Sequence, residues 1–155
     1  MKIELRTMNQ EDLYRWIRWS RDDYAKDRVL SGESEELAKA KAELSFATYF
    51  PDGAPLESHF VYDVFAGEEV VGYLWIGPES PARGGAWWVW DVGVYTGHRG
   101  NGYGRAAMLL AEDEVTRQGG LELGLHVFGF NTAARALYDS LGYTPTSIRM
   151  SKKLG

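Results

Sequence analysis

The sequence predicts an α/β domain in which a single mixed sheet carries helices on both faces. Three observations point to this class. β-rich runs alternate along the chain with four segments of helical periodicity. Residues 86–94 form a near-continuous apolar run, which is typical of a central strand covered on both sides. The chain has 155 residues, of which 45% are hydrophobic and 25% charged, and this favours one core. We therefore expect one domain over residues 1–155.

The first half of the chain predicts one strand, two helices and a hairpin. Residues 2–7 alternate apolar and polar side chains, as a half-buried strand does. Asn9 and Ser34 can each cap a helix; the first helix is expected to run to about Arg28, and the second must end before Pro51. Two β-rich runs, residues 59–65 and 70–76, flank a short turn and predict the hairpin. The second helix is expected to turn these residues inward: Leu37, Ala40, Leu44 and Ala47.

The second half predicts alternating strands and helices. The apolar strand 86–94 contains Asp91 as its only charge. A glycine-rich stretch then opens a helix from about Gly102 to Gln118, which Gly119 and Gly120 end. The remaining elements are expected to be a strand at residues 121–127, a helix at 131–141 and one or two final strands within 143–153.

Composition excludes several classes of protein. No run reaches the ~20 apolar residues of a membrane span, and the charged start lacks the apolar stretch of a signal peptide, so we expect a cytoplasmic protein without a membrane partner. A net charge of −5 argues against general nucleic-acid binding. The chain has no cysteine, and its three histidines are scattered, so we expect neither disulfides nor a metal site.

The glycine-rich turn predicts a phosphate site. Five glycines lie between residues 93 and 104, and Arg99 and Arg105 are the only charged side chains from 95 to 111. Bare backbone amides at the start of a helix bind anions. A turn shaped by packing alone is the alternative. The P-loop pattern is absent, and the match to a dinucleotide fingerprint lacks the acid expected ~20 residues further on, where His126 and Val127 stand.

Two motifs resemble one family. Residues 99–104, Arg-Gly-Asn-Gly-Tyr-Gly, resemble the Arg/Gln-x-x-Gly-x-Gly/Ala signature of the GNAT superfamily of N-acetyltransferases. Residues 131–143 are similar to its Asn-x-x-Ala-x-x-Leu-Tyr-x-x-x-Gly-Phe segment. The resemblance is sharpest over residues 86–145. It implies a GNAT-like fold, with a mixed, mostly antiparallel sheet of six to seven strands and four helices on its two faces. It also implies direct transfer of an acetyl group from acetyl-CoA, as co-substrate, to a primary amine.

The same resemblance implies where coenzyme A would bind. Main-chain amides of the glycine-rich turn would hold the pyrophosphate, and the backbone of residues 92–94 would meet the pantetheine arm. Asn131 can cap its helix and contact that arm, and Gly93 suggests a bulge or a close backbone approach. The expected coenzyme-binding residues are Val92, Gly93, Val94, Arg99, Gly100, Asn101, Gly102, Tyr103, Gly104, Arg105, Asn131 and Tyr138.

Three residues are candidates for proton transfer. Tyr138 matches the family's tyrosine that protonates the departing thiolate. The base, acting through water, is His126 or Asp91; a structural histidine and a buried hydrogen-bond network are the alternatives. Trp88 stands where histone-acetylating relatives carry glutamate, which disfavours their mechanism.

The acceptor is expected opposite the coenzyme, beside an acidic surface. Residues 1–90 carry 10 basic and 16 acidic side chains, which suits a cationic small amine or peptide amine. A homodimer is an assembly that the sequence allows. The rival classes are a non-catalytic acyl-CoA-binding module and a dinucleotide-binding domain. Aromatic side chains are expected to line the acceptor side: Trp16, Trp19, Tyr24, Trp87, Trp88 and Trp90.

Overall fold

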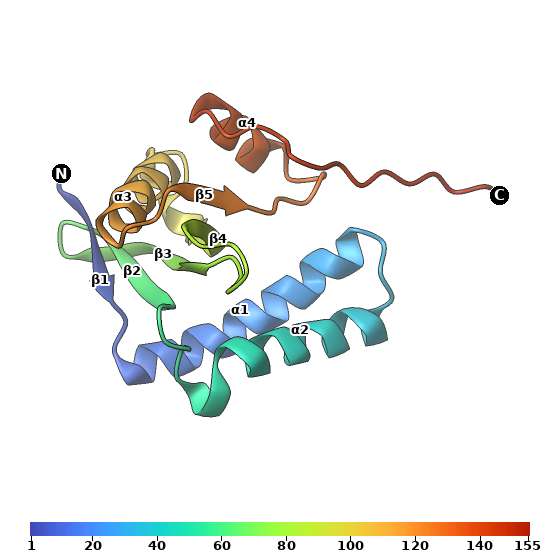
Figure 1. The fold of residues 1–155 in the computed structure, drawn as a ribbon, viewed down its shortest axis with the longest axis horizontal. Helices are drawn as coiled ribbons and strands as arrows, with labels where there is room; N and C mark the ends of the chain where they lie inside the picture. Colours follow the sequence, from blue (N-terminus) through green and yellow to red (C-terminus); the bar gives the residue numbers. More distant parts are fainter.

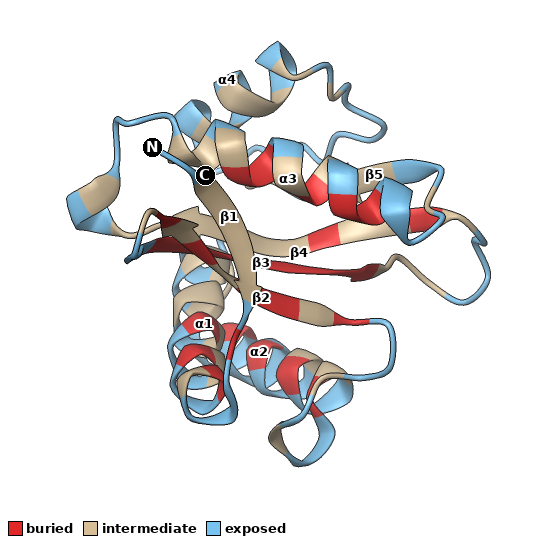
Figure 2. Ribbon diagram, turned by 90° about the vertical axis from the view of Figure 1, so that its left-hand side faces the viewer, coloured by how far each residue is buried: buried red, intermediate tan, exposed pale blue.

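A computed structural model describes residues 1–155 and has one sheet between two helical layers (Figure 1). This arrangement confirms the predicted α/β class. Helices α1 and α2 lie on one side of the sheet, and α3 lies on the other (Figure 2). The elements are β1 (Ile3–Thr7), α1 (Gln10–Leu30), α2 (Glu35–Tyr49), β2 (Phe60–Ala66), β3 (Glu69–Pro78), β4 (Ala86–Val94), α3 (Tyr103–Arg117), β5 (Glu122–Leu125) and α4 (Thr132–Ser140), with 3₁₀ turns at Pro51–Gly53 and Thr96–His98.

The five strands lie in the order β1-β2-β3-β4-β5. The first three pairings are antiparallel, and β4 pairs with β5 in parallel. The sheet therefore has five strands and not the expected six or seven, because the strands predicted in the C-terminal part are absent. Residues 143–153 form no strand, because no neighbouring strand pairs with them and an extended segment becomes a strand only through its partner.

Both predicted helix caps are present at the N-terminal side of the fold. The Asn9 side chain accepts a hydrogen bond from the Asp12 amide at 2.8 Å, and Ser34 Oγ accepts one from the Leu37 amide at 3.2 Å. The first helix runs two residues past the expected Arg28, to Leu30.

The inward face predicted for the second helix is wrong. Leu37, Ala40, Leu44 and Ala47 are all exposed, whereas α2 buries Ala38, Ala42 and Phe46. Both sets have helical spacing, so periodicity alone could not separate them. The small alanines let α2 approach α1 closely, and Phe46 then reaches the sheet.

The sheet separates two hydrophobic cores. Leu74, Ile76 and Met108 lie between the sheet and α3, and none of the three is exposed to solvent. On the other face, Trp16 and Phe46 from α1 and α2 pack around Trp75 of β3. Strands β2 and β3 contribute to both cores, which ties the two layers into one unit. None of the helices has the length and apolar character needed to span a lipid bilayer.

Candidate active site

The candidate site is centred on the edge of β4 that β5 leaves unpaired. The parallel ladder between β4 and β5 ends at Val89 and Leu125, while β4 continues to Val94. Residues 90–94, called here the free β4 edge, therefore lack a backbone partner on the β5 side. The predicted pantetheine-binding residues Val92, Gly93 and Val94 all lie on this edge. Unpaired backbone amides and carbonyls of this kind can bind an extended amide-containing ligand.

A β-bulge begins the free β4 edge. Asp91 is paired with Trp75 and Val89 with Ile76, so Trp90 is an extra residue in β4. Two residues then oppose one, and a bulged strand bends at that point. Trp90 stacks on Trp75 with ring centroids 5.5 Å apart, and Asp91 also faces the α1 layer. The bulge predicted near Gly93 is therefore present three residues earlier.

Gly93 is instead a close-approach position. A Cβ on this residue would lie 2.3 Å from the Tyr73 hydroxyl oxygen, so the aromatic ring crosses directly over the backbone. Tyr73 in turn packs edge-on against Trp19, with centroids 5.1 Å apart. This is the second of the two roles that the sequence suggested for Gly93.

Asp91 is a carboxylate whose ionisation is disfavoured. Burial raises the pKa of Asp91 to about 7, and the charges of Asp23 and Asp27 on α1 add to the shift. Ser20 Oγ donates a hydrogen bond to Asp91 Oδ2 at 2.5 Å and, with the Val92 amide, partly opposes it. A carboxylate with a pKa near 7 can accept and release a proton at neutral pH.

Sequence reasoning missed the partners of Asp91. Ser20, Asp23 and Asp27 are spaced by three and four residues, which places them on one face of α1. That spacing is visible in the sequence. The contact of Ser20 with Asp91, which lies 71 residues further along the chain, cannot be seen in the sequence.

Tyr138 belongs to the same electrostatic neighbourhood as Asp91. It lies on α4 and packs beside the core under α3. Burial raises the pKa of Tyr138, and the charge of Asp91 raises it further. The phenol is therefore protonated at neutral pH and is available as a proton donor.

The charge that acts on His126 is that of Arg28 and not that of Asp91. His126 follows the last residue of β5, where it is exposed and packs edge-on against Phe128 at 4.9 Å between centroids. Burial of part of the ring and the nearby charge of Arg28 lower the pKa of His126. The imidazole is neutral at pH 7, but its charged neighbour is Arg28 at the end of α1.

The glycine-rich turn has the backbone shape of an anion site. Gly100 and Gly102 have φ of 82° and 79°, and a Cβ at either position would meet nothing within 4 Å. Gly102 precedes α3, and no side chain caps the helix, so its first amides are available to a ligand. The first turn of α3 contains no acidic residue.

The other predicted turn residues are held within the chain. Arg99 Nε donates to the Val94 carbonyl at 3.1 Å, and Asn101 Nδ2 donates to the His98 carbonyl at 3.0 Å. Arg105 contacts Ser140 Oγ at 2.6 Å, which ties α3 to α4. Asn131 caps α4 by accepting from the Ala134 amide at 3.3 Å, in agreement with its predicted capping role. Tyr103 is half-buried against the core under α3.

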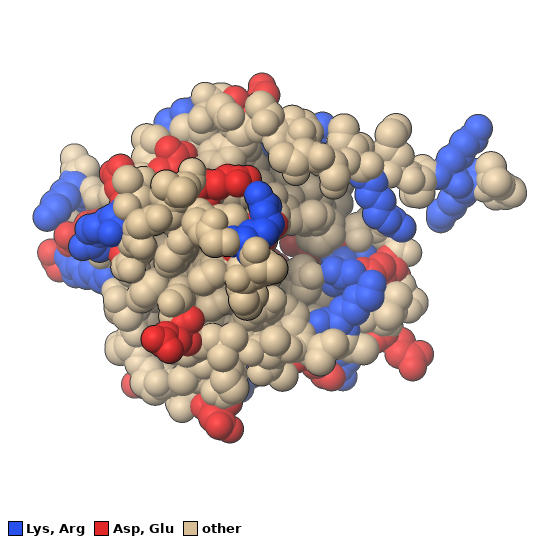
Figure 3. Space-filling model, in the orientation of Figure 1, with Lys and Arg blue, Asp and Glu red and all other residues tan.

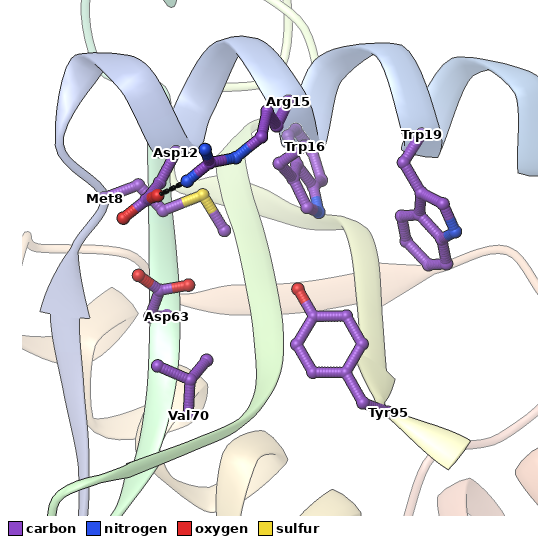
Figure 4. Close-up of a pocket in the computed structure, with 8 residues that line it drawn as sticks. All are labelled: Met8, Asp12, Arg15, Trp16, Trp19, Asp63, Val70 and Tyr95. Carbon is purple, nitrogen blue, oxygen red and sulfur yellow. Dashed lines mark hydrogen bonds and ion pairs between the residues drawn. The ribbon is translucent and has the colours of Figure 1, made fainter. Parts of the chain in front are cut away.

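A pocket of about 300 Å³ lies between α1 and strands β2 and β3 (Figure 4). Burial raises the pKa of its Asp63, and the neighbouring charge of Asp12 adds to this. Tyr95 lines the pocket and directly follows Val94, the last residue of the free β4 edge. Burial and the charges of Asp63 and Asp91 raise the pKa of Tyr95. The lining residues are Met8, Asp12, Arg15, Trp16, Trp19, Asp63, Val70 and Tyr95.

The predicted aromatic lining is divided by the sheet. Trp16, Trp19, Tyr24 and Trp90 lie on the α1 side, and Trp88 packs edge-on against Trp90. Trp87 is wrongly placed by the prediction, because it belongs to the core under α3 and stacks with Phe60. No group of three or more acidic or histidine side chains is arranged to hold a metal ion.

The fold and the two motifs define a class of protein. A family model described as the acetyltransferase (GNAT) family matches residues 12–143. The chain belongs to the GNAT family of acetyltransferases.

Particular relatives cover the whole chain. YycN of Bacillus subtilis, an uncharacterized N-acetyltransferase, is 34% identical over 99% of this chain and 100% of its own length. Its crystal structure has a TM-score of 0.89 at 30% identity, covering 99% of each chain. YdgE of Bacillus subtilis, also an uncharacterized N-acetyltransferase, is 29% identical over 99% of both chains. The fold is shared by PaiA N-acetyltransferase from Thermoplasma acidophilum, solved in complex with coenzyme A, with a TM-score of 0.64 at 18% identity over 93% of this chain and 91% of that one.

Proposed function

We propose that this protein transfers an acetyl group directly from acetyl-CoA to a primary amine, with Asp91 as the general base through water and Tyr138 as the general acid. The observation that carries the proposal is the state of Asp91. Asp91 lies on the free β4 edge and has a pKa of about 7. Its charge also raises the pKa of the Tyr138 phenol. A base at an unpaired strand edge, and an acid on which the charge of that base acts, supply the proton transfers that acyl transfer from a thioester needs.

The coenzyme positions follow from backbone features. The amides at the start of α3, with Gly100 and Gly102, would take the pyrophosphate. The free β4 edge would take the pantetheine amides, as a strand edge takes an extended peptide. That a protein of this fold, PaiA, has been solved with coenzyme A supports this arrangement.

The proposed reaction has three steps: removal of a proton from the acceptor, attack on the thioester and release of the thiol. The Asp91 carboxylate takes a proton from the ammonium form of the acceptor through water. The free amine attacks the thioester carbonyl and forms the N–C bond, and the C–S bond then breaks. Tyr138 donates its proton to the departing thiolate as the C–S bond breaks. A phenol (pKa ~10) is a weaker acid than a thiol (pKa ~8.5), so this transfer is uphill and is completed when the phenoxide regains a proton. The proton left on the product nitrogen passes to solvent or restores the phenol.

His126 is the second candidate for the base. Because the pKa of His126 is lowered, most of the imidazole is in the neutral form, which can accept a proton. Against it stand its exposure and its position beside Arg28, whose positive charge would repel a cationic acceptor.

The acceptor is proposed to be cationic. Asp23 and Asp27 surround Asp91 on the α1 side with negative charge, and burial raises the pKa of Asp27. Trp88 and Trp90 add aromatic faces on this side. A small amine and a peptide amine both fit this chemistry.

The test measures thiol release from acetyl-CoA across a panel of amines. Asp91→Asn and Tyr138→Phe are each expected to lower kcat by about 10²- to 10⁴-fold, as loss of a general base or acid does. The wild-type rate should rise as the pH passes through about 7, where Asp91 loses its proton. The rate of Asp91→Asn should not show this rise. His126→Ala is the comparison and should keep both the rate and this rise.

Three results would contradict parts of the proposal. Unchanged turnover in both Asp91→Asn and Tyr138→Phe would exclude this acid and base. A large loss in His126→Ala alone would transfer the base role to His126. A wild-type protein that binds acetyl-CoA but releases no thiol with any amine would be the non-catalytic module.

A further inference from the structure

The pocket between α1 and strands β2 and β3 is separate from the proposed base. Its Asp63 lies on β2, two strands from β4 and therefore about 10 Å from the free β4 edge. Between them, Tyr73 packs against Trp19 and Tyr95, with ring centroids 5.1 and 5.6 Å apart. Asp91 is not among the residues that line the pocket. A ligand bound here would thus be a second ligand, beside the proposed amine acceptor.

The pocket contains a buried hydrogen-bond donor without an acceptor. Trp16 is only 4% exposed, and no group in the protein accepts a hydrogen bond from its Nε1. Figure 4 shows this nitrogen directed away from α1 and toward the hydroxyl of Tyr95. A buried donor without a partner is costly and rare in folded proteins. An oxygen of a ligand would supply the missing acceptor.

The pocket also contains a carboxylate without a cation. The Asp63 side chain is half-buried, and no hydrogen bond or ion pair compensates for its burial. Two arginines could do so, but both are bound elsewhere. Arg6, opposite Asp63 on β1, donates to Glu4 Oε1 at 2.9 Å. Arg15 is paired with Asp12 (Figure 4). A positive charge on a ligand would supply the missing partner.

Aromatic side chains in the pocket favour an organic cation. Trp19 and Tyr95 pack edge-on, with centroids 6.2 Å apart, and line the pocket together with Trp16. The faces of such rings attract an ammonium group. The charge of the whole surface does not make this selection, because Figure 3 shows acidic and basic side chains interspersed on one face of the molecule. The local groups therefore determine what binds, and the volume of about 300 Å³ requires a small ligand or the end of a chain.

We propose that this pocket binds an organic ammonium ion with a carbonyl or hydroxyl oxygen beside its nitrogen, the ammonium between Asp63 and Tyr95 and the oxygen on the Trp16 N–H. The Tyr95 hydroxyl can accept a hydrogen bond from the ammonium. An amine without the oxygen, or an amide without the charge, would satisfy only one of the two unpartnered groups. A free α-amino amide and the first residue of a peptide both present this pair of groups. The inference concerns binding and stands independently of the acetyl-transfer proposal.

The first test is a titration with glycinamide, followed by the indole N–H signals in ¹⁵N–¹H NMR spectra without acetyl-CoA. At about pH 6.5 the ammonium is charged, and a ligand of this size should bind with a Kd of about 1–10 mM. The signal that is missing in Trp16→Phe identifies Trp16, and in the wild type it should shift until saturation. Propylamine and acetamide each supply one of the two groups and should bind about tenfold more weakly or worse. An unshifted Trp16 signal, or equal affinities for glycinamide and propylamine, would overturn the proposal.

Variants of three acidic residues show which carboxylate binds the ammonium. Asp63→Asn should weaken glycinamide binding by about tenfold or more, and it should still fold because it removes a half-buried charge that nothing compensates. The matched control, Asp113→Asn, is at an exposed position of α3 and should keep the affinity. Asp91→Asn should keep it as well. A Trp16 shift that survives Asp63→Asn but disappears in Asp91→Asn would contradict the proposal, because it would then report the acceptor site.

A second indole is an internal control. Trp90 Nε1 is also buried without a partner, but Trp90 precedes Asp91 on β4. A shift of the Trp90 signal alone would place glycinamide at the free β4 edge and would overturn the proposal. The amide of triglycine distinguishes the two sources of the ligand, because it has the same ammonium and first carbonyl. Affinity equal to that of glycinamide would assign the pocket to a peptide N-terminus, and weaker affinity to a free small molecule.

Discussion

At the scale of one residue, Asp91, the proposed base, lowers the stability of the folded protein at neutral pH. The carboxylate is kept at the free β4 edge by Ser20, but burial and the charges of Asp23 and Asp27 raise its pKa to about 7. In the unfolded chain the pKa of an aspartate is near ~3.9. The folded protein therefore holds a proton over a pH range where the unfolded chain has lost it.

The first prediction is that stability falls as pH rises from about 4 to about 7. Because the folded state binds the additional proton, each pH unit in this window removes up to about 1.4 kcal/mol. Asp91→Asn should flatten this slope and increase stability at pH 8. Urea unfolding at several pH values measures it, and Asp22→Asn, an exposed acid on the same helix, should keep the wild-type slope. An unaltered slope in Asp91→Asn would show that other groups cause it.

At the scale of the element, α3 has a glycine at positive φ before its first residue and another after its last. Gly102 before the helix and Gly119 after it have φ of 79° and 87°, and both have open space where a Cβ would stand. The backbone strain caused by an alanine is therefore similar at the two ends, at about 1–2 kcal/mol. Only the N-terminal glycine faces the expected pyrophosphate.

We accordingly predict that Gly102→Ala and Gly119→Ala lose similar stability, while only Gly102→Ala loses affinity for coenzyme A, by about tenfold or more. Thermal unfolding with and without coenzyme A gives both quantities. Equal retention of affinity in the two variants would mean that the turn does not bind the pyrophosphate.

The same elements show what the sequence could and could not predict. The glycine-rich turn was predictable because its chemistry is local: glycines at positive φ followed by an uncapped helix. The buried face of α2 was not, since Leu37 and Leu44 have the same period as Ala38 and Ala42, and only the closeness of α1 selects the smaller residues. The bulge at Trp90 and the contact of Ser20 with Asp91 depend on pairing between distant segments. The strand predicted within residues 143–153 is absent, because no neighbouring strand pairs with it, and a single sequence does not identify such neighbours.

At the scale of the molecule, the sheet makes two cores unfold together. Met108 is fully buried on the α3 side, whereas Trp16, Trp75 and Trp90 lie on the α1 side. Met108→Ala is predicted to cost about 2–5 kcal/mol. Its unfolding transition should have the same midpoint by circular dichroism and by tryptophan fluorescence, although most tryptophans lie across the sheet. Leu109→Ala, at an exposed neighbour, should cost less than about 1 kcal/mol. Separate midpoints would show that the layers unfold independently.

The bulge has a consequence for insertions and deletions. Trp90 is the one residue inside the ladder from Trp87 to Val94 without its own partner on β3, so removing it would leave every pair of that ladder in register and on its present face. A deletion elsewhere in the strand would instead shift that register. Without Trp90, β4 would have no cause to bend, and it could continue beside residues 126 and 127 past the end of the ladder with β5. The proposed thioester site at the free β4 edge would thus depend on one additional residue in β4, and a protein without that residue would lack the site although both motifs were present.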